Sequence, residues 1–135
     1  MMSKTVSCGK MEGMDGIERI IDALRRVRIS AAMEESEIHA LVAAALEASG
    51  VEYAHERVIA PRCRVDFLCG GVAIEIKKGR APKKALVSQL GRYLESEMVE
   101  GIILLSPYSV DLPETLRGKP VKAVSLSRLN GVTLP

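Results

Sequence analysis

The stretch that most constrains the fold is residues 63–77, which reads CRVDFLCGGVAIEIK. Two short apolar runs flank a Gly-Gly pair, a pattern typical of a β-hairpin with a two-residue type I′ turn. If the glycines form that turn, Cys69 faces Val72 and the register of the two strands follows. It predicts one apolar face, on which lie Cys63, Val65, Phe67, Cys69, Ile74 and Ile76.

The same register places charged residues opposite one another on the second face. Asp66 is expected opposite Glu75, and Arg64 opposite Lys77. Directly opposed like charges destabilise a sheet, so two carboxylates persist there when they share a proton, meet a basic partner or bind a cation. Mg²⁺ prefers oxygen ligands, and Lys77 could orient a water or stabilise developing charge beside it. The alternative is an exposed sheet face with a salt-bridged patch.

The remaining periodicity predicts an α/β protein with a mixed β-sheet flanked by helices. Residues 1–14 lack periodicity and are expected to form a flexible N-terminal arm, so that residues 15–135 make a single domain. The expected order is α-α-β-β-β-α-β-β, with 120–127 as an edge strand. The helices are expected at 16–28, 33–49 and 83–96, and the strands at 52–59, 63–69, 72–77, 101–106 and 120–127.

Composition narrows the function classes. Aromatic residues make up only 3% of the chain, which disfavours stacking of nucleobases on aromatic side chains. The net charge of +2 does not by itself indicate a polyanionic partner. Three cysteines without CxxC spacing disfavour a zinc or iron–sulfur site. The odd cysteine count and the lack of a signal-peptide pattern favour a cytoplasmic protein. No apolar run reaches the roughly 18–20 residues of a membrane span.

Asp66, followed nine residues later by Glu75-Ile76-Lys77, resembles the D…(D/E)-x-K signature of the PD-(D/E)XK nuclease superfamily. Val65 stands where many members have a proline. The resemblance spans about residues 34–106 and implies a restriction-endonuclease-like fold. It also implies that Asp66 and Glu75 bind Mg²⁺ or Mn²⁺ and that Lys77 positions the attacking water.

A second element lies in the following helix, SQLGRYLE, where Gln89 and Tyr93 match the QxxxY element of the RecB-like branch. Their spacing of i and i+4, with Arg92 at i+3, puts the three side chains on one helix face. The resemblance implies that Gln89 braces Lys77 or the metal-bound waters, and that Arg92 and Tyr93 contact nucleic acid. The alternative is a half-buried polar face on which Tyr93 is a packing residue.

In that superfamily a glutamate on the helix before the sheet often completes the metal site. Glu34, Glu35 and Glu37 are the candidates. At about 100° per residue, Glu34 and Glu35 lie in or beside the apolar stripe of their helix, whereas Glu37 lies off it. The segment ESEIHALV resembles the family's helix with its acid first, which favours Glu35, with Glu37 as the alternative. The structural alternative is that these glutamates stand near the N-terminus of the helix because the helix dipole favours acids there.

Basic residues without an intervening acid follow the signature. This segment adjoins the proposed metal site, where the phosphate of a nucleic acid would approach, so it is either a backbone-binding patch or a solvated loop. His39 and His55 lie in no triad or metal-ligand spacing and are expected to be structural or surface residues. The segment's residues beyond Lys77 are Lys78, Arg80, Lys83 and Lys84.

Taken together, the sequence favours a Mg²⁺- or Mn²⁺-dependent nuclease that hydrolyses phosphodiester bonds, in DNA rather than RNA. Asp66 and Glu75 would hold the metal, Glu35 would complete the site, and Gln89 would support Lys77. The alternative is a non-catalytic nucleic-acid-binding or assembly module on the same fold. The small size of the chain suggests a homodimer, and many members of the superfamily that it resembles are homodimers.

Overall fold

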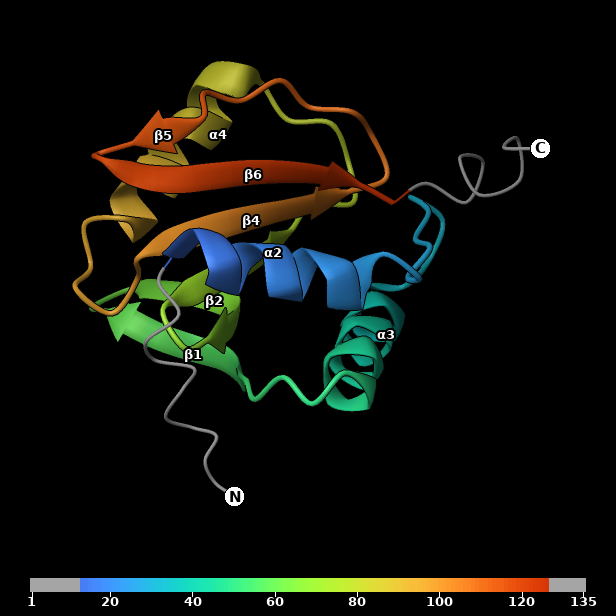
Figure 1. The fold of residues 1–135 in the computed structure, drawn as a ribbon. Helices are drawn as coiled ribbons and strands as arrows, with labels where there is room; N and C mark the ends of the chain where they lie inside the picture. The colour runs from blue at the N-terminus through green and yellow to red at the C-terminus, as the bar shows by residue number, and fades with distance from the viewer. Residues whose placement is uncertain (1–12, 127–135) are drawn as a thin grey trace.

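The computed structural model describes residues 13–126, with side chains from residue 16 onward, and Figure 1 shows its ribbon. Of the arm expected at 1–14, residues 1–12 lie outside the described residues, and a helix already begins at residue 13. None of the described helices is long and apolar enough to cross a membrane. The elements are α2 (Gly13–Leu24), α3 (Glu35–Ala48), β1 (Ala54–Ala60), β2 (Cys63–Cys69), β3 (Val72–Ile76), α4 (Lys83–Tyr93), β4 (Gly101–Ser106), β5 (Thr115–Leu116) and β6 (Lys119–Ser125).

The strands form one mixed sheet in the order β1-β2-β3-β4-β6-β5. The first three are antiparallel neighbours, whereas β4 runs parallel to both β3 and β6. Helix α4 makes the crossover that a parallel β3–β4 pair requires. The predicted α/β class with a mixed, helix-flanked sheet is confirmed. The edge position predicted for 120–127 is wrong, because the two-residue strand β5, which the sequence analysis lacked, pairs with β6 on its outer side.

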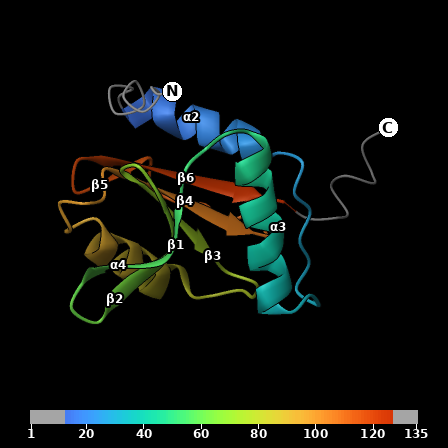
Figure 2. The ribbon, with the colours of Figure 1, turned by 90° about the horizontal axis from the view of Figure 1, so that it is seen from below.

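The sheet separates two apolar cores. Helices α2 and α3 lie on one face and α4 on the other, as the two views of the ribbon show (Figures 1 and 2). All six residues of β4 are buried, which explains why GIILLS is a continuous apolar run rather than an alternating one. The core under α2 and α3 contains Phe67, Ile74, Ile76 and Ile103, and the core under α4 contains Val65, Leu90, Ile102 and Leu104.

The first helix ends earlier than predicted. Helix α2 stops at Leu24 instead of 28, because the chain then extends and the Ile29 N–H donates to the Leu126 carbonyl at 2.8 Å. Ile29 is fully buried, and both it and Leu126 belong to the core under α2 and α3. Helix α4 also ends early, at Tyr93, whereas the bounds of β2 and β4 match the prediction.

The β2–β3 turn differs from the predicted type. Gly70 has φ 61°, but Gly71 does not adopt a left-handed conformation, whereas a type I′ turn needs positive φ at both positions. The Gly71 carbonyl instead accepts the N–H of Glu100 at 2.6 Å. A Cβ on Gly71 would lie 2.9 Å from the Glu100 side chain, so a larger residue there would require that exposed side chain to move.

The predicted apolar face of the hairpin is only partly right. Phe67 lies in the core under α2 and α3, but Val65 lies in the core under α4, and Cys63 packs there too. The alternation changes at Asp66, where the β1–β2 pairs on either side are His55–Phe67 and Arg57–Val65. The residue of β1 between those two pairs, Glu56, has φ 54°, so a local twist redirects the strand.

Candidate functional site

The pairing of strands β2 and β3 ends just before Asp66. Their ladder consists of three pairs that end at Phe67–Ile74. Beyond it, the carboxylate of Asp66 accepts the backbone N–H of Ile76 through Oδ2 at 2.8 Å. A side chain therefore replaces the next ladder contact, and Asp66 is anchored in the opening between two adjacent strands.

The separation corrects the opposed charge pairs predicted for this face. Arg64 pairs with Val58 of β1, while the N–H of Lys77 donates to the Leu105 carbonyl of β4. The end of β3 thus keeps its pairing with β4 on one edge, while on the other edge the Asp66 side chain takes the place of β2. Asp66 lies close enough to Glu75 that its charge raises the pKa of Glu75.

Glu75 is a buried carboxylate with one partnered and one unpartnered oxygen. Its Oε2 accepts the Tyr93 hydroxyl at 3.3 Å and lies 3.7 Å from Lys77 Nζ. Its Oε1 has no hydrogen-bond partner among the described residues. Burial, and then the charge of Asp66, raise the pKa of Glu75 from 4.5 to about 7, against the opposing effects of Lys77 and Tyr93. A carboxylate in this state gains from a cation.

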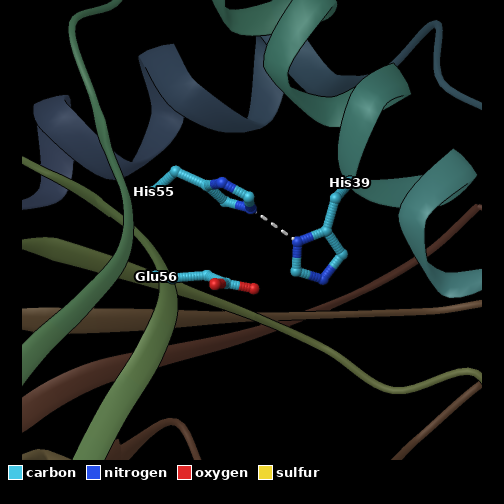
Figure 3. Close-up of side chains that lie close together, drawn as sticks. All are labelled: His39, His55 and Glu56. Atoms are coloured by element: carbon cyan, nitrogen blue, oxygen red, sulfur yellow. Dashed lines mark hydrogen bonds between the residues drawn. The ribbon is translucent and has the colours of Figure 1, made fainter.

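His39 on α3 joins the acids. Its ring is 8% exposed, and its Nε2 lies 3.8 Å from Asp66 Oδ1 and 4.0 Å from Glu35 Oε2. These distances are too long for hydrogen bonds, so Nε2 is buried without a partner among the described residues. Its Nδ1 lies 2.8 Å from Nε2 of His55 on β1 (Figure 3).

His39 is buried and His55 is exposed, in line with the structural or surface positions expected for them, but their place beside the acids was not expected. The available signal was the i, i+4 spacing of Glu35 and His39, which puts both on one face of α3. Asp66 shares their environment: burial raises its pKa, while the Ile76 N–H and His39 oppose that shift. His39 Nε2 and Glu75 Oε1 are thus two buried polar atoms that have no hydrogen-bond partner among the described residues and lie near the anchored carboxylate of Asp66.

Of the three glutamates considered for the helix, Glu35 faces this region. It lines the same pocket as His39 and Asp66, and neither Glu34 nor Glu37 does. Glu35 is 67% exposed, so its carboxylate is free to move by rotation toward Asp66.

The residues of the QxxxY element and Arg92 occupy different environments in the structure. Tyr93 is 6% exposed and its hydroxyl donates to Glu75, so the expected contact of Tyr93 with nucleic acid is replaced by a buried contact at the acidic cluster. Gln89 is half-buried on the same helix, and its side chain makes no hydrogen bond with the described residues. Arg92 is exposed, as a phosphate contact requires.

The basic segment after β3 is held by side-chain contacts that a solvated loop would lack. Lys78 is half-buried, and its Nζ donates to the Met33 carbonyl at 2.7 Å. Lys83 Nζ lies 3.7 Å from Asp111 Oδ2, with both side chains largely exposed. Lys78 therefore ties the segment to the start of α3, whereas Lys83 remains available to solvent.

Two further cations of the segment are exposed. The Arg80 guanidinium lies 3.9 Å from the centroid of the Tyr108 ring, a cation–π contact. Arg80 and Tyr108 line a pocket that also includes Lys77 and Lys83. Lys84 is exposed in the first turn of α4. A basic surface thus adjoins the ammonium of Lys77.

Comparisons of the chain with protein-family models, with curated proteins and with solved structures find no match.

Proposed function

We propose that this protein is a Mg²⁺- or Mn²⁺-dependent nuclease that hydrolyses phosphodiester bonds, with DNA as its substrate. The observation that carries the proposal is the pair of buried, unpartnered atoms His39 Nε2 and Glu75 Oε1 beside Asp66. Leaving such atoms without partners costs about 1–3 kcal/mol each. A bound cation offsets that cost and also relieves the repulsion between the carboxylates.

The residues offer ligand atoms for a hard divalent cation, although no three of them lie within 4.8 Å of one another among the described residues, so they would have to draw together around it. Asp66 and Glu75 offer carboxylate oxygens, Glu35 adds a third from the adjacent helix, and His39 Nε2 adds a nitrogen ligand. When bound, such an ion supplies Lewis-acid stabilisation of charge on the phosphate. The hydrogen bond from Ile76 N–H fixes Asp66, so the ligand set rests on the backbone of the sheet.

Other side chains supply the remaining tasks of hydrolysis. The Lys77 ammonium, 3.7 Å from Glu75 Oε2, is placed to hold the attacking water and to stabilise negative charge that develops on the phosphate. Tyr93 orients Glu75 through the hydrogen bond that its hydroxyl donates to Oε2. The role of Gln89 as a second support for Lys77 stays a prediction.

The finer fold assignment belongs to the same proposal. A restriction-endonuclease-like arrangement is supported by Asp66, Glu75 and Lys77, which stand at the diverging ends of two adjacent strands after a helix that bears Glu35. Arg80, Lys84 and Arg92 are the exposed cations proposed to bind the DNA backbone, with Lys83 beside them. The homodimer and the cytoplasmic location stay predictions.

A non-catalytic nucleic-acid-binding module is the second candidate. It is favoured by the contacts that Glu75 Oε2 already makes with Tyr93 and Lys77, since a purely structural network would use the same groups.

One experiment separates the candidates. Linear, circular, branched and single-stranded DNA, and RNA, are each incubated with the protein in Mn²⁺ or in EDTA. We expect cleavage of DNA in Mn²⁺, none in EDTA, and none by Asp66→Asn, while Asp22→Asn, which changes an exposed acid on α2, cuts like the parent. Binding without cleavage would establish the module instead, and cleavage by Asp66→Asn would contradict the assignment.

A further inference from the structure

The two histidines and Glu56 form a group of potential metal ligands on the solvent side of His39. One ligand atom from each of the three residues lies within 4.8 Å of the other two. Nδ1 of His39 and Nε2 of His55 are 2.8 Å apart, and the carboxylate of Glu56 points toward His39 (Figure 3). His55 and Glu56 are exposed on the edge strand β1, so a solute can reach them.

The backbone of β1 is bent to make this grouping. Consecutive residues of a regular strand point to opposite faces, so His55 and Glu56 should diverge. Glu56 instead has φ 54°, a left-handed conformation that is uncommon for a residue other than glycine. Strain of this kind concentrates at functional sites, and here it accompanies the convergence of the Glu56 carboxylate with the two imidazoles.

A buried aromatic ring holds the two imidazoles in place. The centroid of Phe67, which is fully buried, lies 4.7 Å from that of His55 and 5.6 Å from that of His39. The nitrogen pair is therefore supported from the core of the protein, which limits the rotamers of both histidines before any ligand binds.

We propose that His39 Nδ1, His55 Nε2 and the Glu56 carboxylate bind a borderline transition-metal ion of the Zn²⁺ class. Imidazole nitrogens suit Zn²⁺ far better than Mg²⁺, and three protein ligands leave the fourth position to water. Ligand atoms at about 2.1 Å from a tetrahedral ion are about 3.4 Å apart. The nitrogens must separate slightly and the carboxylate must approach, which the exposed side chains of His55 and Glu56 on the edge strand β1 permit.

The site shares His39 with the hard-cation site of the proposed nuclease, and this consequence rests on that proposal. A neutral imidazole carries one proton on its two nitrogens. An ion on Nδ1 leaves the proton on Nε2, facing Asp66; a cation beside Nε2 requires the proton on Nδ1, where it is donated to His55. Binding at one site therefore weakens binding at the other, and the effect is reciprocal.

Direct binding of Zn²⁺, and of Co²⁺ as its visible substitute, tests the site. Metal-free protein is titrated by calorimetry and absorption, with His55→Phe, which keeps a ring against Phe67, Glu56→Gln, and Glu52→Gln as the exposed control. We expect one tight equivalent in the parent and in the control. Both site variants should lose at least about tenfold in affinity, since even outer partners of metal ligands typically cost 10–100-fold. The Co²⁺ spectrum should lack thiolate charge-transfer bands.

Asp66→Asn distinguishes this site from the nuclease site. It should lose Mn²⁺ but keep Zn²⁺, whereas His55→Phe should do the reverse. Zn²⁺ binding that survives in both His55→Phe and Glu56→Gln, or that is lost in Asp66→Asn, would overturn the proposal, as would thiolate bands. If Mn²⁺ fails to bind the parent, the nuclease proposal fails while the Zn²⁺ site stands. An Mn²⁺ affinity unchanged by Zn²⁺ would overturn the sharing of His39.

Discussion

Replacing Glu75 by glutamine should stabilise the metal-free protein, although it removes a group proposed to be essential. In the folded protein the pKa of Glu75 is raised to about 7 from its ordinary 4.5, first by burial and then by Asp66. The fold thus opposes ionisation of this side chain. Glutamine keeps the size of glutamate and carries no charge, so it removes that opposition.

The direction and size of the effect follow from proton linkage. Below pH 4.5 the carboxyl is protonated in the folded and unfolded chains alike, and above about pH 7 it is ionised in both. Between these values the folded protein binds the proton more strongly, so the free energy of unfolding falls as the pH rises, by about 3 kcal/mol in total. For a chain of this length that corresponds to roughly 10 °C in melting temperature.

Thermal unfolding in EDTA at pH 5 and pH 8 measures this change in stability. The parent should be less stable at pH 8 than Glu75→Gln and should approach it at pH 5, whereas Glu97→Gln, which alters an exposed acid, should follow the parent. Mn²⁺ should stabilise the parent and not Glu75→Gln. A Glu75→Gln protein less stable than the parent at pH 8, or with the same pH dependence, would refute the reasoning and indicate a structural ion pair with Lys77.

Three further results are expected. Lys77→Arg and Lys77→Ala should each cut at least about a hundredfold more slowly in single turnover, since a planar guanidinium does not replace a compact ammonium that orients one water; an arginine variant near the parent rate would contradict this role. Tyr93→Phe should raise the pKa of Glu75 further, because its hydroxyl donates to the carboxylate, and should move the acidic limb of the pH–rate profile upward; an unchanged profile would count against the contact. Replacing Arg80 and Lys84 by glutamine should reduce the slope of log affinity for DNA against log salt by about one to two. An unchanged slope would mean that the two side chains are solvated and do not contact phosphates.

Much of the fold was predictable because local patterns agree with the tertiary structure. The hairpin register followed from the Gly-Gly pair, and the structure confirms it from Cys69–Val72 to Phe67–Ile74. The run GIILLS indicated a strand buried on both faces, and β4 is buried throughout. The two-residue strand β5 left no such signal, since it exists through pairing with β6 and not through a pattern of its own.

The candidate site was predictable in its residues and not in its geometry. Asp66, Glu75 and Lys77 could be named from spacing, but the separation of β2 from β3 at Asp66, where a side chain accepts the Ile76 N–H, is a feature of the sheet that the spacing does not encode. His39 and His55 lie 16 residues apart, on α3 and β1, so their contact depends on the tertiary structure. No pattern in either segment alone could indicate that contact.

The most direct test of the central claim is a titration of Mn²⁺ into metal-free protein, followed by electron paramagnetic resonance. The account predicts that the parent binds Mn²⁺ and that Asp66→Asn and Glu75→Gln each weaken binding at least about tenfold, while Glu97→Gln leaves it unchanged. Equal Mn²⁺ affinity in the parent and in Asp66→Asn would contradict the claim that Asp66 and Glu75 form a metal site.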